Sequence, residues 1–523
     1  MPKGSDRWYL LLWTCFAVAV VLSRRFFIGD GVRHVPYILT HSVPAIGEAR
    51  WLLFPSFLFG VLRPLYLSGI VQTTEGALIP FGLASVLFST LYLGALRMWL
   101  IHQEVATSRR WVALGMASVC SPFLFLATDT AEPIFAATFC AIGLTVVSCT
   151  QRLPLGVLLI SLGLFLHQTV FVAFFLLPMA TGWGKLRDPR EIRRTGLVVG
   201  AVVTVILGIL MMANHIALND AVERILLVYR NPTHMNWMRG GILKGLAVTV
   251  IGGFPQALVT IPGMHGMKAI ADGVRHGDSH SLGQFCRLGF GFLLILSGGI
   301  YTVRHHRWEW LVALVGFSIL PVVWNNVYGY QKFYMLFPLL AAHVIARVTP
   351  RASLPIVGLL AFSNINALIA DVRAGREKYT ARTVQYQHAS QTSRWITSGW
   401  GPDFSYLWPG RDCGMLKSLA KPSAAKSVEI LRAERTGEFI ECVREAFCSG
   451  QPVWTDDWIQ VNAASIGDIA TFHGLSSSFL DRTWWRGAQD GEAVDRDPLH
   501  SLYTYAPERR VQICSSLREE IGH

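Results

Sequence analysis

The sequence predicts an α-helical polytopic membrane protein of about 11 transmembrane helices, followed by a small α/β extracytoplasmic domain at the C-terminus. Of its 523 residues, 52% are hydrophobic and only 15% are charged, a balance unlike that of water-soluble proteins. Apolar runs recur from Trp8 to Ala370. They are about 20 residues long, which is the length that a helix needs to cross a hydrocarbon core of roughly 30 Å. We therefore expect a membrane domain over 1–370 and a soluble domain over 371–523.

The positive charge belongs to the membrane domain. Residues 1–370 hold 28 Lys and Arg against 14 Asp and Glu, a balance of +14, while residues 371–523 hold 18 against 20, a balance of −2. The basic residues form short clusters beside apolar runs rather than a continuous stripe with interleaved aromatics. That pattern indicates membrane orientation and contact with membrane lipid, and it argues against binding of nucleic acid.

One threading of the chain places all five internal basic clusters on the cytoplasmic side, as the positive-inside rule requires. The clusters are Arg109 and Arg110, Arg152, 185–194, 304–307 and 347–351. The crossings lie near 8–23, 79–100, 111–127, 131–149, 154–167, 168–182, 196–216, 288–303, 308–323, 330–347 and 353–370. We read the first as a retained signal anchor with a cytoplasmic start in the cell's inner or plasma membrane, so an odd number of crossings leaves the tail outside. Arg24 and Arg25 follow the first crossing and break the rule.

Two apolar segments must then be non-crossing parts of the outer loops 24–78 and 217–287. Residues 51–70 and 243–262 are each interrupted by Pro and Gly, as interfacial or re-entrant pieces are. The threading also divides 154–181 into two short crossings at His167. The alternative is one long tilted helix, which would place the basic run after it on the outer side.

The tail carries four cysteines, which allow two disulfides in three possible pairings and fit an oxidising compartment. They are Cys413, Cys442, Cys448 and Cys514. Apolar spacing predicts an amphipathic helix over 427–447. Short apolar pieces near Val453, Ile466 and Val511 predict strands.

Acidic residues in two outer loops are the first candidate site residues, because charge is costly near a bilayer. Asp30 lies between two glycines that permit a tight turn close to a ligand, although Asp and Gly also form ordinary loop turns. Asp129 and Glu132 lie between the third and fourth crossings. Their structural alternative is an N-cap and a favourable helix dipole contact.

Further candidates are a histidine and several cations with aromatic neighbours. His167 lies within an apolar stretch, where a buried histidine is more often structural than a ligand. Lys332 and Tyr334 open the tenth crossing, with a membrane-interface anchor as the alternative. Arg230 and Arg239 lie in the second outer loop and suit an anionic lipid phosphate, with nonspecific attraction to anionic lipid as the alternative.

These motifs together resemble the GT-C class of integral-membrane glycosyltransferases, which includes protein mannosyltransferases and aminoarabinose transferases. The resemblance rests on Asp30 in the first outer loop, the string TDTAEP over 128–133, Lys332-Phe333-Tyr334 leading to Pro338, and the tail string PVWTDDW over 452–458. The chain departs from many relatives in three ways. In the first loop, Asp30 is followed by Gly31 where many relatives have two adjacent acidic residues. Lys332 replaces the more usual arginine, and His167 stands where relatives often have lysine.

The resemblance implies transfer of a sugar from a polyprenyl-phosphate donor to a hydroxyl of a lipid, glycan or protein acceptor at the outer membrane face. Asp30 would act as general base. Asp129 or Glu132 would position the acceptor, or hold a divalent cation if the reaction uses one; no other cofactor is expected. The phosphate would be held by a basic and aromatic set: Arg230, Arg239, Lys332, Tyr334 and His167.

Other classes of protein fit parts of this pattern. A multi-span transporter or flippase also buries histidine and acidic residues, a polysaccharide polymerase or ligase shares the lipid-linked donor, and a noncatalytic scaffold would use its outer tail to bind a partner. The absence of Walker, HExxH and GxSxG motifs leaves nucleotide-binding, zincin and hydrolase readings without support.

Overall fold

The computed structural model describes the membrane half almost continuously and the tail in part. The described residues are 6–24, 53–72, 74–182, 186–213, 253–260, 267–305, 308–323, 334–388, 394–397, 412–414, 441–456, 494–497 and 502–521, with the single positions 35, 38 and 219.

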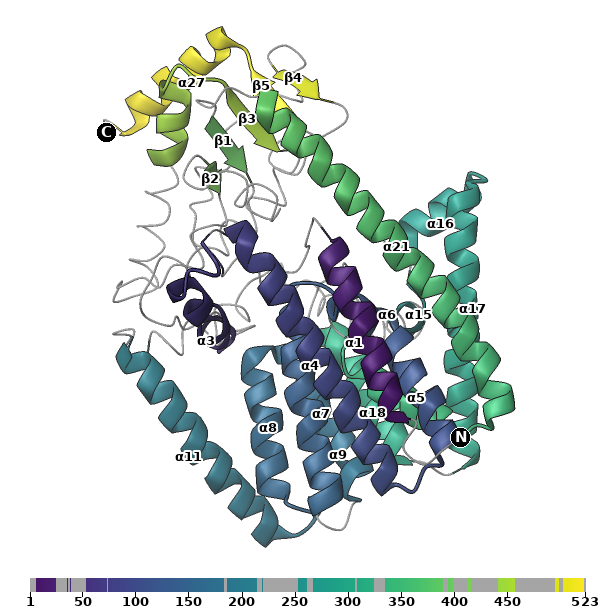
Figure 1. The fold of residues 1–523 in the computed structure, drawn as a ribbon. Coiled ribbons are helices and arrows are strands. Elements are labelled where there is room, and N and C mark those ends of the chain that lie inside the picture. The colour runs from purple at the N-terminus through teal and green to yellow at the C-terminus, as the bar shows by residue number, and fades with distance from the viewer. Residues whose placement is uncertain are drawn as a thin grey trace.

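The membrane half is an α-helical bundle from which one long helix leads to a small sheet (Figure 1). Its helices are α1 (Asp6–Ser23), α3 (Phe54–Leu67), α4 (Thr74–His102), α5 (Thr107–Val119), α6 (Ser121–Leu126), α7 (Glu132–Thr150), α8 (Leu153–Leu166), the 3-10 helix η2 (Gln168–Val172), α9 (Ala173–Thr181), α11 (Pro189–Ala213), α15 (Phe254–Leu258), α16 (Met267–Arg275), α17 (Ser279–Arg304), α18 (Trp308–Val323), α20 (Phe337–Ile345) and α21 (Pro350–His388).

The predicted polytopic membrane class is confirmed. Among the described residues, six helices are long and apolar enough to cross a membrane, and they correspond to the first, second, fourth, seventh, eighth and eleventh predicted crossings. The helices α8, α18 and the η2–α9 segment are shorter and apolar. The non-crossing segment expected over 51–70 contains α3, a helix of 14 residues. The total of eleven crossings remains a prediction.

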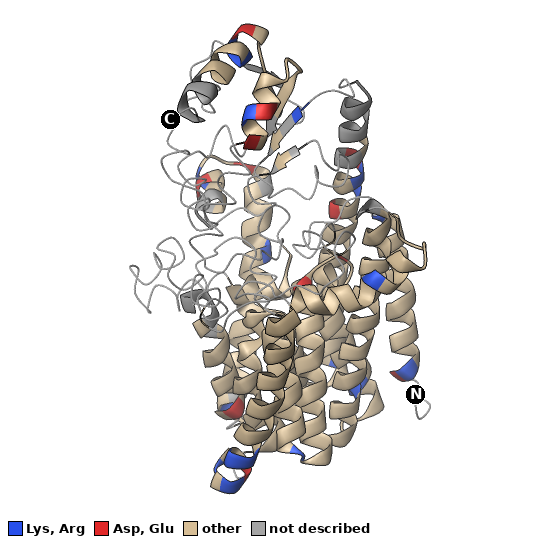
Figure 2. Cartoon of the chain, turned by 90° about the vertical axis from the view of Figure 1, so that its left-hand side faces the viewer, with Lys and Arg blue, Asp and Glu red and all other residues tan. Residues whose placement is uncertain are grey.

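The N-terminus and the C-terminal sheet lie at opposite ends of the bundle (Figure 1). The links α4–α5, α7–α8, α9–α11 and α17–α18 lie at the end of the N-terminus, which we call the N-terminal end. Lys and Arg of the bundle gather there (Figure 2). The other end, nearest the sheet, we call the sheet end. This arrangement agrees with the predicted clustering of basic residues at one end, and the assignment of that end to the cytoplasm remains a prediction.

The predicted third crossing is not one continuous helix, because α5 ends at Val119 and α6 starts at Ser121. Pro122 lies in the first turn of α6, and its ring cannot follow a preceding helical turn. The break leaves the carbonyl of Val119 without a helical partner. Asn364 of α21 supplies one, because its Nδ2 donates to the oxygens of Val119 and Leu258, at 2.7 Å each.

The core of the bundle is α4, α7 and α8, held by close backbone approach. Thr138 and Thr145 of α7 lie two turns apart, and their hydroxyls donate to the carbonyls of Phe88 and Ala95 of α4 at 2.9 and 3.0 Å. On the other side of α7, a Cβ atom at Gly156 of α8 would lie 2.6 Å from the carbonyl oxygen of Gly143. Glycine is therefore required for these helices to pack at this distance.

The predicted division at His167 is confirmed, and the alternative of one long helix is wrong. His167 has extended backbone angles, φ −157° and ψ 121°, between α8 and η2. Its Nδ1 lies 2.7 Å from the hydroxyl of Thr169 and accepts from the backbone N–H of the same residue at 3.4 Å. The imidazole thus caps the new helix where the chain reverses.

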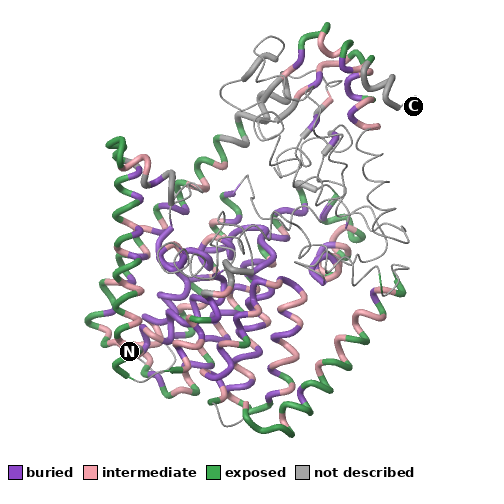
Figure 3. Tube along the Cα trace, turned by 180° about the vertical axis from the view of Figure 1, so that it is seen from behind, coloured by how far each residue is buried: buried purple, intermediate pink, exposed green. Residues whose placement is uncertain are grey.

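The helix α11, on the outside of the bundle, presents apolar side chains to the surroundings. Exposed and half-buried residues line most of α11, which leans away from the buried core (Figure 3). Leu197, Val205 and Met212 are 66%, 60% and 71% exposed. A helix with such a surface requires lipid around it, as a membrane span has.

The tail contains the predicted small α/β domain. Its mixed sheet has the order β2-β1-β3-β5-β4, with β1 (Arg394–Thr397), β2 (Asp412–Gly414), β3 (Val453–Asp456), β4 (Val494–Asp497) and β5 (Leu502–Tyr505). Strands β2 and β3 both pair with β1 in parallel, and β5 pairs antiparallel with β3 and β4. The predicted boundary at residue 370 falls inside α21, whose 39 residues continue from the bundle toward β1.

One tail prediction is wrong, one is confirmed, and one is confirmed for its described part. Val511 lies in the helix α27 (Pro507–Ile521), because Pro507 starts a helix and Ile513 buries its apolar face. The strand near Val453 is β3, and residues 441–448 form the end of the predicted helix over 427–447. The rest of that helix and the strand near Ile466 lie outside the described residues.

The tail cysteines form two disulfides, which resolves the three pairings left open by the sequence. Cys413 joins Cys442 and Cys448 joins Cys514. These bonds tie β2 and α27 to the helix at 441–448, so both long connections of the domain are closed covalently.

Candidate functional site

The sheet end of the bundle contains a buried ionic cluster made by three separate parts of the chain. Arg24 follows directly after α1, Asp129 lies in the turn before α7, and Asp371 lies on α21. The Arg24 Nη1 atom is 3.2 Å from Oδ2 of Asp371 and 4.0 Å from Oδ2 of Asp129. Only 2% of the Arg24 side chain and 9% of the Asp129 side chain are exposed. We call these three residues the Arg24 cluster.

Asp129 is oriented by its own turn as well as by the guanidinium. Its Oδ1 accepts from the backbone N–H of Thr130 at 2.7 Å and lies 3.4 Å from the Thr130 hydroxyl. One carboxylate oxygen therefore stabilises the turn while the other faces Arg24. Asp129 is not the N-cap that the sequence offered as its structural alternative, because Ala131 occupies that position and no side chain caps the helix. Its bond to Thr130 stabilises the turn, and the ion pair is an interaction across the fold.

Glu132 begins α7 at the same turn and is 1% exposed. Its carboxylate lies in the first helical turn, where the unsatisfied N–H groups and the helix dipole stabilise negative charge. Burial raises the free energy of a charged group unless its surroundings compensate. The sheet end therefore holds Asp129 and Asp371 against Arg24, with Glu132 in the turn that follows Asp129.

Tyr334 lies in an aromatic cluster beneath the same end. Its ring centroid is 5.7 Å from that of Phe254 and 6.2 Å from that of Phe317. Gly253 approaches so closely that a Cβ atom there would lie 2.9 Å from the Cζ atom of Tyr334. Tyr92 donates from its hydroxyl to the carbonyl of Met335 at 3.2 Å, which fixes this turn against α4. Tyr334 is fully buried, so packing accounts for its position.

Four predicted site residues lie outside the described residues: Asp30, Arg230, Arg239 and Lys332. Of the others, the structure brings Asp129 and Glu132 into one turn beside Arg24. His167 lies at the α8–η2 junction with Thr169 as its partner. The assignment of all these residues to catalysis or to phosphate binding remains a prediction.

A metal ion has no ready set of ligands in the described part of the chain. No three His, Cys, Asp or Glu side chains group there in a way that could hold one. Asp129 directs one oxygen to a backbone N–H and the other toward a guanidinium. A role for a divalent cation therefore stays an expectation from sequence, and the chemistry proposed below does not use one.

Arg24 and Asp371 were not predicted as site residues. The sequence nevertheless contains a signal for Arg24, because it breaks the positive-inside rule at the outer end of the first crossing. The structure explains the exception, since two carboxylates balance its charge inside the protein. The sequence contains no such signal for Asp371. It directly follows the last apolar run, where a charged residue is ordinary.

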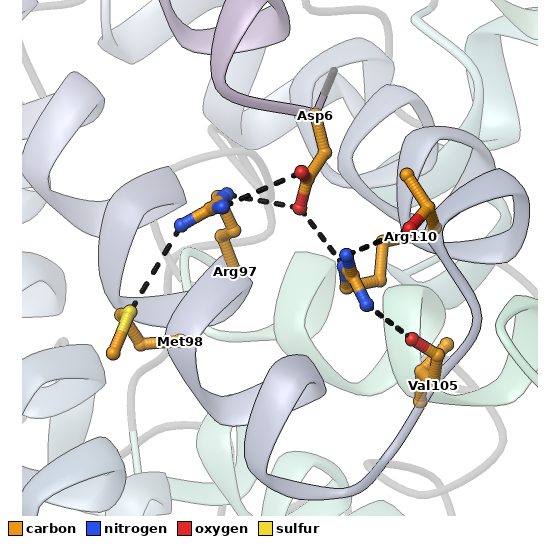
Figure 4. Close-up of polar contacts among 6 residues, drawn as sticks. Asp6, Arg97, Met98, Val105 and Arg110 are labelled. Carbon is orange, nitrogen blue, oxygen red and sulfur yellow. Dashed lines mark hydrogen bonds and ion pairs between the residues drawn. The ribbon is translucent and has the colours of Figure 1, made fainter. Parts of the chain in front are cut away.

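A second buried ionic cluster lies at the N-terminal end and has the opposite composition (Figure 4). Asp6 of α1 is fully buried between two arginines. Its Oδ2 lies 2.9 Å from Nε of Arg97 and 2.8 Å from Nε of Arg110, and Oδ1 accepts from Arg97 at 3.3 Å. Arg110 also donates to the carbonyl of Val105 and to the hydroxyl of Thr107. We call these the Asp6 cluster.

Comparison with known proteins gives a structural likeness without a matching sequence family. No family profile and no curated protein sequence matches the chain. In a search of solved structures, the chain is similar to ArnT from Cupriavidus metallidurans in the apo state, with 14% identity and a TM-score of 0.43 over 88% of this chain and 95% of that one.

Proposed function

We propose that this protein is a membrane glycosyltransferase that moves a sugar from a polyprenyl-phosphate donor to an acceptor hydroxyl at the sheet end of the bundle. The observation that supports this most is the buried acidic turn of Asp129 and Glu132 beside Arg24. Sugar transfer from a lipid phosphate requires carboxylates that bind or deprotonate the acceptor hydroxyl. Carboxylates buried at one end of an apolar bundle are costly to place there, which favours a functional role.

The reaction forms one bond to the anomeric carbon and breaks another. The acceptor oxygen attacks that carbon, and its proton passes to the Asp30 carboxylate acting as general base. The bond between the anomeric carbon and the phosphate oxygen breaks, and its electron pair leaves with the polyprenyl phosphate. Attack from the face opposite the leaving group inverts the configuration of the sugar.

The remaining candidates divide into two roles. Asp129 and Glu132 orient the acceptor hydroxyl, since carboxylates accept hydrogen bonds from sugar hydroxyls. Arg230, Arg239 and Lys332 offset the negative charge that grows on the departing phosphate. His167 and Tyr334 contribute by shaping the region around it, because capping and packing hold them in place.

The two disulfides support an extracytoplasmic position for the tail. Disulfides persist in oxidising compartments and are rare in the cytosol. Outside the cytoplasm a nucleotide sugar is not at hand, so a sugar already attached to a membrane lipid is the chemically available donor. Described Lys and Arg residues cluster at the opposite, N-terminal end of the bundle, as the positive-inside rule expects of a cytoplasmic end (Figure 2).

The test is turnover by the purified protein in detergent. Polyprenyl-phosphate glucose, mannose and aminoarabinose are supplied separately with a membrane-lipid extract as acceptor, and release of free polyprenyl phosphate is measured. General-base assistance is worth about 10²–10⁴ in rate, so Asp30→Asn should lower kcat by that factor. Asp188→Asn, an exposed substitution near the N-terminal end, is the control and should leave kcat unchanged.

Two outcomes would contradict the proposal. Equal kcat in Asp30→Asn and the wild type would remove the role assigned to Asp30. Movement of solute across liposomes without consumption of any lipid-linked donor would replace the transferase with a carrier.

A further inference from the structure

Arg24 contacts both the acidic turn and the helix leading to the C-terminal domain. It lies at the end of α1, and its backbone N–H completes the last turn by donating to the carbonyl of Val20 at 3.0 Å. The side chain is 2% exposed and therefore has little freedom to reach other partners. Both the backbone and the side chain of Arg24 are therefore held in place.

One of the segments that Arg24 joins bears directly on the proposed reaction. Asp129 shares its turn with Glu132, and these two carboxylates are the proposed acceptor-orienting element. A displacement of Arg24 would change the position of the Asp129 carboxylate relative to α21.

The third member of the cluster connects this point to the tail. Asp371 lies two turns after Asn364 on α21, and Asn364 is tied to the α5–α6 break. It also accepts from the backbone N–H of Thr260 at 2.8 Å. The helix is therefore clamped at Asn364 before it reaches Arg24. It then continues to His388 and leads to β1.

We propose that Arg24 is a positioning residue that holds the Asp129 turn in place against α21, with Asp371 fixing its guanidinium. The inference rests on the proposed function and extends it to residues that do not touch the substrate. Arginine suits this role because its planar guanidinium presents several N–H groups in a fixed arrangement, so it can face two carboxylates at once. Lysine would keep the charge and lose that geometry.

The experiment measures kcat and KM for the donor that the wild type consumes, per folded molecule. A misplacement of about 1 Å costs on the order of 100-fold in rate, so Arg24→Gln should lower kcat about 100-fold and leave KM nearly unchanged. Arg24→Lys should recover part of the loss. The charge-reversed pair Arg24→Asp with Asp371→Arg should turn over at least about tenfold faster than either single reversal, because it restores an opposite-charge contact.

Arg97→Gln is the matched control, since it removes a buried arginine from the cluster at the opposite end of α1. It should lower the melting temperature while kcat per folded molecule stays at the wild-type value. If the wild type is active and Arg24→Gln keeps the wild-type kcat, the positioning role alone would be overturned. The same holds if the wild type is active and the charge-reversed pair shows no recovery. Failure of the wild type with every polyprenyl-phosphate donor would overturn the proposed function and this role with it.

Discussion

The two ends of α1 carry opposite versions of the same interaction. At the N-terminal end, one buried carboxylate is shared by two arginines, whose remaining contacts go to nearby groups of the bundle. At the sheet end, one buried arginine is shared by two carboxylates, with Glu132 in the same turn. The first cluster has an excess of positive charge and the second an excess of negative charge. Both clusters are buried. We propose that the first anchors helices of the bundle to one another and that the second positions carboxylates for the proposed reaction.

The difference lies in what the surrounding segments lead to. The Asp6 cluster joins α1, α4 and α5, which are all parts of the bundle. The Arg24 cluster joins α1 to the acidic turn and to α21, the helix that leads to the C-terminal domain. Substitutions at the two ends should therefore separate stability from turnover, and the following predictions run from the largest effect on stability to the smallest.

Asp6→Asn should cause the largest loss of stability. It leaves two arginines buried without a compensating charge, and breaking a buried ion pair costs about 3–5 kcal/mol. The free energy of unfolding, measured by chemical denaturation in detergent, should fall by that amount. Glu191→Gln is the control, because its pair with Arg194 is 4.0 Å long and largely exposed, and its removal should cost less than about 1 kcal/mol. Equal losses in the two variants would contradict the anchoring role.

Asn364→Leu should have the next largest effect. The side chain satisfies the carbonyls of Val119 and Leu258 and the N–H of Thr260, and all three become unsatisfied in an apolar environment. At about 1–3 kcal/mol for each buried unsatisfied group, and with some relaxation, we expect a loss of about 2–3 kcal/mol. Asn366→Leu, two residues away on the exposed side of α21, should change stability by less than about 0.5 kcal/mol. A similar stability in both variants would show that Asn364 does not clamp the helix.

Gly156→Ala should have the smallest of these effects, because it tests packing rather than charge. The added methyl group meets the backbone of α7, so the helices must separate, and overpacking of this kind costs about 1–3 kcal/mol. Gly200→Ala on α11 meets no atom within 4 Å and should be neutral or slightly stabilising. If Gly156→Ala proved as mild as Gly200→Ala, α7 and α8 would not be in close backbone contact.

The sequence predicted the bundle because the length and spacing of apolar runs reflect the thickness of the bilayer, which acts on each helix separately. It also located the reversal at His167, since the distribution of basic residues required one there. The break at Cys120 was missed, because the apolar run continues through it. The carbonyl that the break leaves unpaired accepts a hydrogen bond from Asn364, 245 residues after Val119, and no local pattern indicates such a partner. Val511 was assigned to a strand because a short apolar piece fits either structure.

The candidate site was only partly accessible from sequence. Asp129 and Glu132 were recognised as acidic residues in a costly environment, and the structure places them in one buried turn. Arg24 appeared only as an exception to a charge rule, and Asp371 did not appear at all. Their association depends on the packing of α21 against the end of α1, and no local pattern encodes a contact between positions so far apart in the chain.

The most direct test of this account compares turnover in Arg24→Gln and Asp6→Asn, using the same polyprenyl-phosphate donor and correcting each rate for the folded fraction. The account predicts that kcat falls about 100-fold in Arg24→Gln and stays near the wild-type value in Asp6→Asn, although Asp6→Asn is the less stable protein. Equal turnover per folded molecule in the two variants would show that the two ends of α1 do not differ in function, and would contradict the account.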